Sequence, residues 1–245
     1  MKSDWKQSRR NGLLVFEPAH VPRGVLVALS GRGVAPAAAP SPTEFLARRF
    51  ADALALDGAP IVRATQVHGR RSALVAVAPD AGSVSDAGPC DILATALSGV
   101  ALAVQTADCV PILLAGRAAV ATAHAGWRGT SLEAAAAAVT ALTELGEAPP
   151  DILAWLGPSI GACCYEVGPE IEDAFDAEFR RPGQRDRSHL DLPAANRAQL
   201  QAAGLADENI HIHPACTRCG GEELASYRRD GTRAGRMIGL IARLS

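Results

Sequence analysis

The sequence predicts an α+β fold, in which a single domain over residues 1–245 carries mixed β-sheet layers flanked by helices. Short apolar segments of strand length recur along the chain with few helical segments between them, which favours a mixed or antiparallel sheet over a doubly wound one. A chain of 245 residues can bury one substantial core. The low-complexity stretch GRGVAPAAAPSP, residues 31–42, comes early and is typical of a surface loop.

The first half of the chain is predicted to contain several strands and one helix. Ser41-Pro42-Thr43-Glu44 forms a capping box with proline at the first helical position, which predicts a helix over residues 42–56 that stops before Asp57-Gly58. The apolar runs around this helix predict strands at 13–16, 25–30, 61–69, 73–77, 91–96 and 100–105. His68 therefore lies at a strand end.

The centre of the chain reads QTADCVPILLAGRAAVATAHAGWRGT over residues 105–130. Its two apolar runs, 110–114 and 119–123, are separated by a Gly-Arg turn signal and predict a hairpin. In a hairpin, Cys109 at the start of one strand and His124 at the end of the other lie at the same end of the sheet. The glycine-flanked bend that follows places Arg128 at the N-terminus of a helix predicted over 131–145, where an anion such as phosphate is favoured.

The second half of the chain predicts a strand at 151–156, followed by the glycine- and proline-rich loop GPSIGACCYEVG. Loops of this kind tend to be functional. Beyond it we expect helices at 170–180 and 193–203, a strand at 210–213, a short helix that ends at Tyr227 and a last strand at 236–244.

Composition excludes several classes of protein. The formal net charge is −2 and aromatic residues are 4% of the chain, so the basic stripe and stacking side chains of a nucleic-acid-binding protein are missing from the sequence. The polar start MKSDWKQSRRNG is followed by no long apolar run, so we expect neither a signal peptide nor a membrane span, and a cytoplasmic location. No obligate protein partner is evident. The six cysteines are then expected to be reduced, with some of them reactive or metal-binding.

His68, Cys109 and His124 each lie at a predicted strand end. Two imidazoles and one thiolate make a three-ligand site for a metal such as zinc, with a fourth position left for water or substrate. The alternative is that Cys109 is a small buried apolar residue and that the histidines are loop residues bonded to the backbone.

Several motifs occur in order along the chain: QVHG around His68, TADCVPILL around Cys109, HAGWRGT from His124, GPSIGACCYEVG, and ACT with SYRRDGTRAGRMIGLI near the end. Together they cover roughly residues 25–244 and resemble the laccase-domain family, also called multicopper polyphenol oxidase-like proteins. The resemblance implies a zinc-binding purine nucleoside enzyme that cleaves adenosine, inosine, guanosine or methylthioadenosine with phosphate and can deaminate adenosine. It also implies that His68, Cys109 and His124 are the metal ligands and catalytic residues.

Neighbouring polar residues are candidates for binding the nucleoside and phosphate. Arg128 is the expected phosphate ligand. Gln105 and Asp108 could orient a ligand histidine or bind a sugar hydroxyl, or simply cap a strand end. Arg63 could face the same cleft or be a solvated edge charge.

Other functions stay open on the sequence. A copper-dependent polyphenol oxidase is the alternative suggested by the family's name, and copper could replace zinc at an N/S site, but the chain has only six histidines and two methionines and lacks the repeated His-x-His pairs of a three-copper cluster. A hydrolase with Cys109 as nucleophile and His124 as base, acting for example on a cell-wall precursor, uses the same residues. A non-enzymatic interaction module is the remaining alternative.

Two further groups of cysteines need an interpretation. Cys163 and Cys164 are adjacent and are expected to serve packing. His211, His213, Cys216 and Cys219 supply four metal-ligand side chains, but all four come from nine residues, whereas structural zinc sites usually draw ligand pairs from two separated segments. We therefore favour a structural loop there over a second metal or a redox-active thiol pair.

Overall fold

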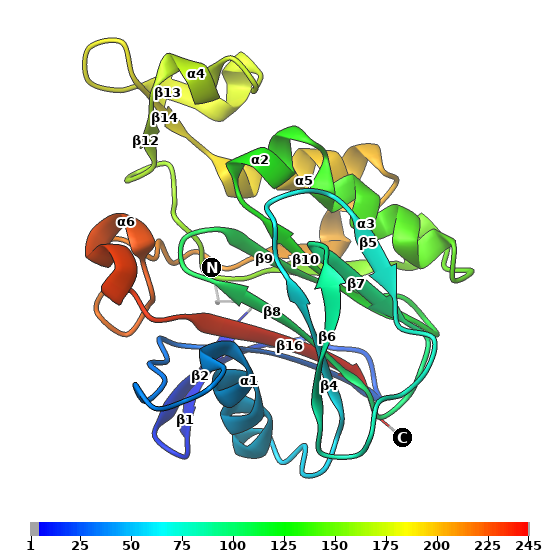
Figure 1. The fold of residues 1–245 in the computed structure, drawn as a ribbon. Coiled ribbons are helices and arrows are strands. Elements are labelled where there is room, and N and C mark those ends of the chain that lie inside the picture. Colours follow the sequence, from blue (N-terminus) through cyan, green and yellow to red (C-terminus); the bar gives the residue numbers. More distant parts are fainter. Residues whose placement is uncertain (1–4, 245) are drawn as a thin grey trace.

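The computed structural model describes residues 5–244 and confirms the α+β class. Within these residues a seven-stranded sheet has the order β1-β2-β3-β16-β8-β4-β6 (Figure 1). It is mixed, because β4 pairs in parallel with β6 and β8 while the other neighbours are antiparallel. Its strands are β1 (Trp5–Arg10), β2 (Leu13–Pro18), β3 (Val25–Ser30), β4 (Ile61–Thr65), β6 (Val84–Pro89), β8 (Ala101–Thr106) and β16 (Met237–Arg243).

A second sheet, six-stranded within the described residues, has the order β15-β11-β9-β10-β7-β5. Its strands are β5 (Ser72–Leu74), β7 (Ile92–Thr95), β9 (Val110–Ala115), β10 (Val120–Ala125), β11 (Leu153–Leu156) and β15 (Ile210–Ile212). The two sheets pack face to face around a core that includes Leu29, Leu113 and Trp155. Helix α1 (Pro42–Ala53) covers the outer face of the larger sheet, and α3 (Ala134–Thr143) and α5 (Leu192–Ala202) cover that of the smaller one, which makes four layers (Figure 1).

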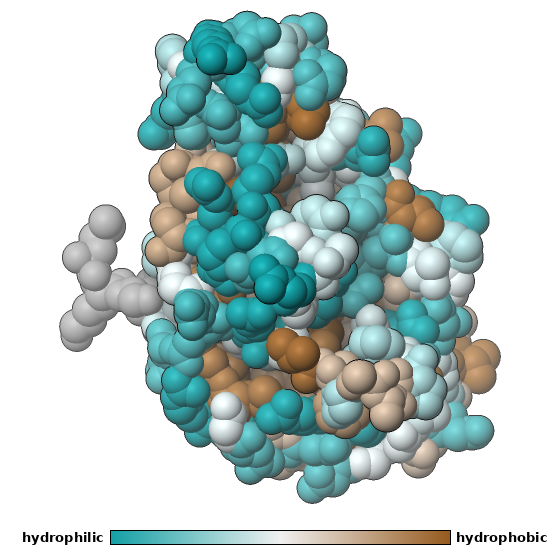
Figure 2. Space-filling view, turned by 60° about the vertical axis from the view of Figure 1, so that its left-hand side comes forward, coloured by the Kyte–Doolittle hydropathy of each residue, from teal (hydrophilic) through white to brown (hydrophobic). Residues whose placement is uncertain are grey.

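A small sheet projects from this body next to α4 (Pro169–Glu172), as Figure 1 shows. Within residues 5–244 it has three strands: β12 (Glu166–Val167), β13 (Arg180–Pro182) and β14 (Ser188–Leu190). The face of the molecule shown in Figure 2 is mostly hydrophilic, and the apolar side chains on it form separate small patches. The remaining short elements are α2 (Trp127–Ser131), α6 (Tyr227–Asp230) and 3-10 turns at Pro149–Asp151, Ala177–Phe179, Asp207–Asn209 and Gly231–Arg233.

The predicted central hairpin is confirmed. Strands β9 and β10 pair antiparallel, from Ala115 opposite Val120 to Val110 opposite Ala125. Every residue of both strands is buried, because one face packs on the other sheet and the opposite face on α3. The helix start at Pro42 and its Ser41 N-cap are also confirmed: the Ser41 hydroxyl accepts a hydrogen bond from the Glu44 N–H, while the Glu44 carboxylate pairs with Arg63.

Several predicted elements were wrong or missing. The helix predicted over 131–145 is broken at Glu133, whose φ of 62° lets α3 restart at an angle that buries its alanines against β10. The helix predicted over 170–180 is only α4 and a 3-10 turn at Ala177–Phe179, with Phe175 buried and Phe179 partly buried against the core beside α5. The short helix expected to end at Tyr227 instead begins there as α6. Edge strands β1 and β6 were missed because their side chains are mostly exposed or half-buried, which removes the apolar pattern.

Every helix within residues 5–244 is too short or too polar to cross a lipid bilayer.

Candidate metal centre

The fold brings His68, Cys109 and His124 together. Their ligand atoms all lie within 4.8 Å of one another, and the two imidazole rings are 4.8 Å apart between centroids at an interplanar angle of 78°. Cys109 directly precedes β9, His124 lies near the end of β10, and His68 follows β4 in a loop. The hairpin therefore supplies two ligand side chains, and the neighbouring sheet supplies the third.

Gly126 makes this close approach possible. A Cβ atom at this position would lie 2.8 Å from the Cys109 sulfur and 3.3 Å from Cδ2 of His68. Any side chain would push the thiol or the imidazole out of place. The first glycine of the HAGWRG bend is thus required by the space that the ligands occupy, and its backbone is extended at φ −78°.

The buried carboxylate of Asp91 organises the ligands from behind. Its Oδ1 accepts hydrogen bonds from the His68 N–H (2.9 Å) and from Nδ1 of His124 (2.8 Å). Its Oδ2 accepts from the N–H groups of Val67 (3.2 Å) and Gly69 (2.7 Å). Because a carboxylate only accepts, Nδ1 of His124 carries the proton and Nε2 is left to bind a metal. The same bonds hold the His68 backbone at a φ of 62°.

Electrostatics favour the ionised thiol. Burial opposes ionisation of Cys109, but its hydrogen bonds with His124 and His68 outweigh burial and lower the pKa of the thiol to about 6. Burial also disfavours the charged form of His124, yet its bonds to Asp91 and Cys109 raise its pKa to about 9. Burial acts against the charge of Asp91 as well, and the hydrogen bond from His124 leads those that keep its pKa below the usual range. A thiolate is the form that binds metals.

The donor set fits a zinc or copper ion. One thiolate and two imidazoles are the ligands that such borderline metals take, and three protein ligands leave a coordination position for substrate or water. Asp91 supplies the carboxylate that usually orients a metal-binding histidine.

A cavity of about 530 Å³ opens over the three ligands. Besides the ligands, it is lined by polar, aromatic and basic side chains on the loop after β4, the end of β8, the 157–168 loop and the segment from α6 to β16: Gln66, Gln105, Thr106, Ala107, Asp108, Tyr165, Tyr227, Arg228 and Arg236. The volume and lining suit a small polar molecule with a flat ring.

Gln105 and Asp108 line this cavity, as sequence reasoning expected of site residues, but both have structural partners. The Gln105 side chain accepts a hydrogen bond from the Thr43 hydroxyl at 2.6 Å. The Asp108 carboxylate accepts from the Thr217 hydroxyl and from the Arg228 N–H, each at 2.6 Å. Asp108 thus holds the segments around Thr217 and Arg228 in place beside the cavity.

Neither Arg63 nor Arg128 is among the described residues that line the cavity. Arg63, on β4, forms ion pairs with Glu44 at 2.8 Å and Asp86 at 2.9 Å, which occupy its guanidinium. Arg128 is exposed, and its guanidinium stacks on the ring of Trp127 at 4.7 Å. The bend after His124 therefore turns this arginine outward.

Sequence reasoning missed Asp91 and the basic side of the cavity. Arg228 and Arg236 lie there, the former stacked over the Tyr165 ring at 4.9 Å. The available signal was the arginine-rich segment SYRRDGTRAGRM just before the last strand, which returns to the centre of the larger sheet. The sequence pattern predicts Asp91 only as the first residue of a strand.

The four potential ligands His211, His213, Cys216 and Cys219 do not come together in the structure, which agrees with the preference against a metal site formed by these four. His211 stacks on Trp155, and His213 packs edge-on against Trp5 and Phe16. Cys216 and Cys219 instead meet Cys163 and Cys164. His211 lies in β15 and His213 directly after it, whereas Cys216 and Cys219 lie in the turn beyond, next to the 157–168 loop.

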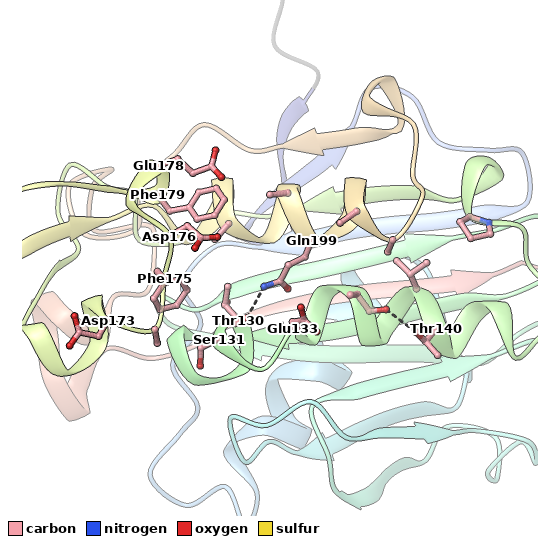
Figure 3. Close-up of a pocket in the computed structure, with 18 of the residues that line it drawn as sticks. Thr130, Ser131, Glu133, Thr140, Asp173, Phe175, Asp176, Glu178, Phe179 and Gln199 are labelled. Carbon is pink, nitrogen blue, oxygen red and sulfur yellow. Dashed lines mark hydrogen bonds between the residues drawn. The ribbon is translucent and has the colours of Figure 1, made fainter.

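A larger cavity of about 770 Å³ lies elsewhere, between α2, α3, α5 and the segment after α4 (Figure 3). Its rim carries acidic side chains such as Glu133, Asp173 and Asp176, and Gln199 donates to the Thr130 carbonyl within it. None of the described residues that line it is a histidine or cysteine. The smaller cavity, which holds the three potential metal ligands, is therefore the candidate site.

Comparisons with known proteins identify the family of the chain. A family model described as multi-copper polyphenol oxidoreductase laccase matches residues 43–244. The chain is 43% identical over 156 residues to a protein named adenosine deaminase RL5 from an unknown prokaryotic organism, an alignment that covers 60% of this chain and 59% of that protein. It is 39% identical over 202 residues to a Streptomyces griseus protein named purine nucleoside phosphorylase ORF3, covering 79% and 78%.

Among solved structures, the crystal structure of YlmD from Geobacillus stearothermophilus superposes with a TM-score of 0.83 at 31% identity, covering 99% of this chain and all of the other. The chain spans about three fifths of the length of the adenosine deaminase.

Proposed function

Because the chain belongs to the multi-copper polyphenol oxidoreductase laccase family, we propose that it is a zinc-dependent enzyme that cleaves purine nucleosides with phosphate. The observation that carries the proposal is a cavity in which two imidazoles and a low-pKa thiol lie beside tyrosine rings and arginine side chains. The name of the Streptomyces griseus relative adds support. Adenosine, inosine, guanosine and methylthioadenosine are the substrates that we propose.

The basic side of the cavity is suited to phosphate. Arg236 is half-buried and Arg228 lines the same space, so both can bind an anion through charge-assisted hydrogen bonds. Arg228 is already positioned, because its N–H donates to Asp108 and its guanidinium donates to the Glu166 carbonyl. These two residues replace Arg128 as the phosphate ligands in our proposal.

The aromatic side chains are suited to the purine. Tyr227 lines the cavity and is 56% exposed, so its ring can stack on a flat base. Tyr165 lies opposite a positive charge, and burial raises the pKa of its phenol to about 12, so it stays a neutral hydrogen-bond donor. Gln66 holds the neighbouring strand by exchanging hydrogen bonds of 2.9 Å with the Gln105 backbone.

His68, Cys109 and His124 would hold the metal, which when bound would supply a Lewis acid beside the substrate. His124 stays oriented by Asp91 throughout. His68 is the exposed member of the group, and it can pass a proton to the departing base when it is not committed to the metal.

Adenosine deamination is a second candidate, favoured by the name of the relative that is 43% identical. It requires the same ligands and a water in place of phosphate. A multi-copper oxidase fits less well, because residues 5–244 hold two groups of potential metal ligands, of which one has two histidines and the other none.

The test is phosphate-dependent turnover of adenosine and inosine by protein whose metal content has been measured. The products are separated and identified by chromatography. We expect ribose 1-phosphate and free base, lost on chelation and restored by zinc. Inosine formed from adenosine without phosphate would favour the deaminase. Activity that survives complete metal removal would contradict the proposal and point to a thiol hydrolase, and phenol oxidation that requires copper would point to the oxidase.

A further inference from the structure

The fold forms a second group of potential metal ligands that the proposed reaction does not use. Cys163 and Cys164 lie in the 157–168 loop after β11, and Cys216 and Cys219 lie in the turn after β15. Their four sulfur atoms all lie within 4.8 Å of one another. The ligand pairs thus come from two separated segments, as in structural zinc sites.

The spacing of the sulfurs matches a tetrahedral ion. Zinc–sulfur bonds of about 2.3 Å at tetrahedral angles put neighbouring sulfurs about 3.8 Å apart. The sulfurs of Cys163 and Cys219 are 3.7 Å apart. This distance is far longer than the roughly 2 Å of a disulfide bond, and all four cysteines are free thiols.

The backbone around Cys216 is arranged to stabilise a thiolate. The Gly161 N–H donates to its sulfur at 3.3 Å. The turn is tight, with the Gly220 N–H bonded to the Cys216 carbonyl at 2.7 Å, and a Cβ at Gly220 would lie only 2.5 Å from that oxygen. N–H groups directed at a thiolate stabilise its negative charge.

The two segments are held in register independently of the sulfurs. Ser159 and Cys216 form a parallel β-bridge, with the Thr217 N–H donating to the Ser159 carbonyl at 2.9 Å. Arg229 fastens the turn by donating to the carbonyls of Thr217 (3.0 Å), Gly221 (2.9 Å) and Leu224 (2.8 Å). The four thiols are therefore preorganised.

We propose that Cys163, Cys164, Cys216 and Cys219 form a structural zinc site, separate from the His68, Cys109 and His124 centre. Four thiolates fill the coordination sphere, so no position is left for substrate. Binding releases the thiol protons to solvent, and no electron is transferred. Cys163 and Cys219 are exposed, which gives the ion a path of entry, while Cys164 and Cys216 close the inner side.

Such an ion would brace the wall of the active-site cavity. Thr217, which follows Cys216, donates to the Asp108 carboxylate next to Cys109. Tyr165, which follows Cys164, lines the cavity itself. One tetrahedral site would thus fix the two segments that position these side chains.

The experiment measures zinc per chain, by elemental mass spectrometry, in protein purified with zinc and a reductant. We expect about two ions in the wild type, about one in Cys109→Ala and about one in the double variant Cys163→Ser/Cys219→Ser, whose replaced side chains are exposed. Cys90→Ala, the remaining cysteine and outside both groups, serves as the control and should keep about two.

Cobalt in place of zinc gives a spectroscopic readout that does not depend on activity and that can be recorded with all four cysteines intact. Cobalt-loaded Cys109→Ala should show the intense visible absorption of a tetrahedral tetrathiolate complex, and Cys163→Ser/Cys219→Ser should lack it. One ion in the wild type that disappears in Cys109→Ala would overturn the proposal. So would disulfides between these cysteines in freshly purified protein, detected by intact mass.

Discussion

Replacing Asp91 with asparagine tests the architecture of the candidate metal centre. The carboxylate accepts from His68 N–H and His124 Nδ1 through one oxygen, and from Val67 and Gly69 N–H through the other. An amide has one acceptor oxygen, so in either orientation its NH2 group faces two donors. Two of the four bonds are lost, together with the charge opposite His124.

The magnitude follows from these bonds. A hydrogen bond to a charged group contributes about 1.5–3 kcal/mol, and breaking a buried charged pair costs about 3–5 kcal/mol. We therefore expect the free energy of unfolding of metal-free Asp91→Asn to fall by about 3–5 kcal/mol. Loss of the orienting carboxylate should weaken zinc binding about 10–100-fold, which corresponds to about 1.4–2.7 kcal/mol.

Zinc affinity would be measured by competition with a chelating indicator, and stability by urea unfolding of the metal-free protein. Asp86→Asn is the matched control, because Asp86 also accepts from two backbone N–H groups, those of Thr65 and Gly88, and pairs with Arg63, but is not among the residues around the metal ligands. The control should lose stability and keep its zinc affinity. Folded Asp91→Asn that binds zinc as tightly as the wild type would refute the role assigned to this carboxylate.

Three further predictions concern other parts of the molecule. Gly126→Ala should weaken zinc binding while the chain stays folded, because its Cβ would displace the Cys109 sulfur; unchanged affinity in the same titration would contradict the packing argument. Arg236→Ala should raise the phosphate KM of phosphorolysis about ten- to hundredfold and Arg128→Ala less than about twofold; equal effects would exclude the proposed phosphate position. Burial lowers the pKa of His213 to about 4, so the unfolded chain binds a proton at this residue more readily than the native protein does. The free energy of unfolding should therefore fall by about 3 kcal/mol as the pH drops from about 6.5 toward 4. Urea unfolding of His213→Asn should lack this part of the pH dependence.

The sequence predicts the centre of the molecule well because local and tertiary signals agree there. The runs flanking the Gly-Arg turn are apolar except for Thr122, and both strands are buried on both faces. That agreement places Cys109 and His124 at one end of the sheet without any knowledge of the remaining strands. His68 could be placed only as the last polar residue of a strand, and the structure puts it in the loop that Asp91 holds.

The parts that the sequence does not predict depend on long-range contacts. Asp91 is 33 residues from His124, so no local pattern marks their hydrogen bond. Arg228 and Arg236 reach the cavity only because β16 inserts between β3 and β8. Strand pairing also brings Cys163 and Cys164 to the turn that carries Cys216 and Cys219. Because β11 pairs in parallel with β15, the segments that follow these two strands lie side by side. Sequence spacing grouped Cys216 with His213, whereas strand pairing groups it with Cys163.

Asp108 connects these distant contacts to the metal centre. Its φ of 88° is unusual for a residue other than glycine and costs conformational energy, which its surroundings must offset. They do so with the Thr217 hydroxyl and the Arg228 N–H on the carboxylate and the Ile160 N–H on the carbonyl. The backbone direction that aims Cys109 at the histidines is therefore maintained by the cysteine-bearing turn, the arginine segment and the 157–168 loop. A substitution in any of these three segments should therefore displace the Cys109 thiol before it disturbs the β9–β10 hairpin.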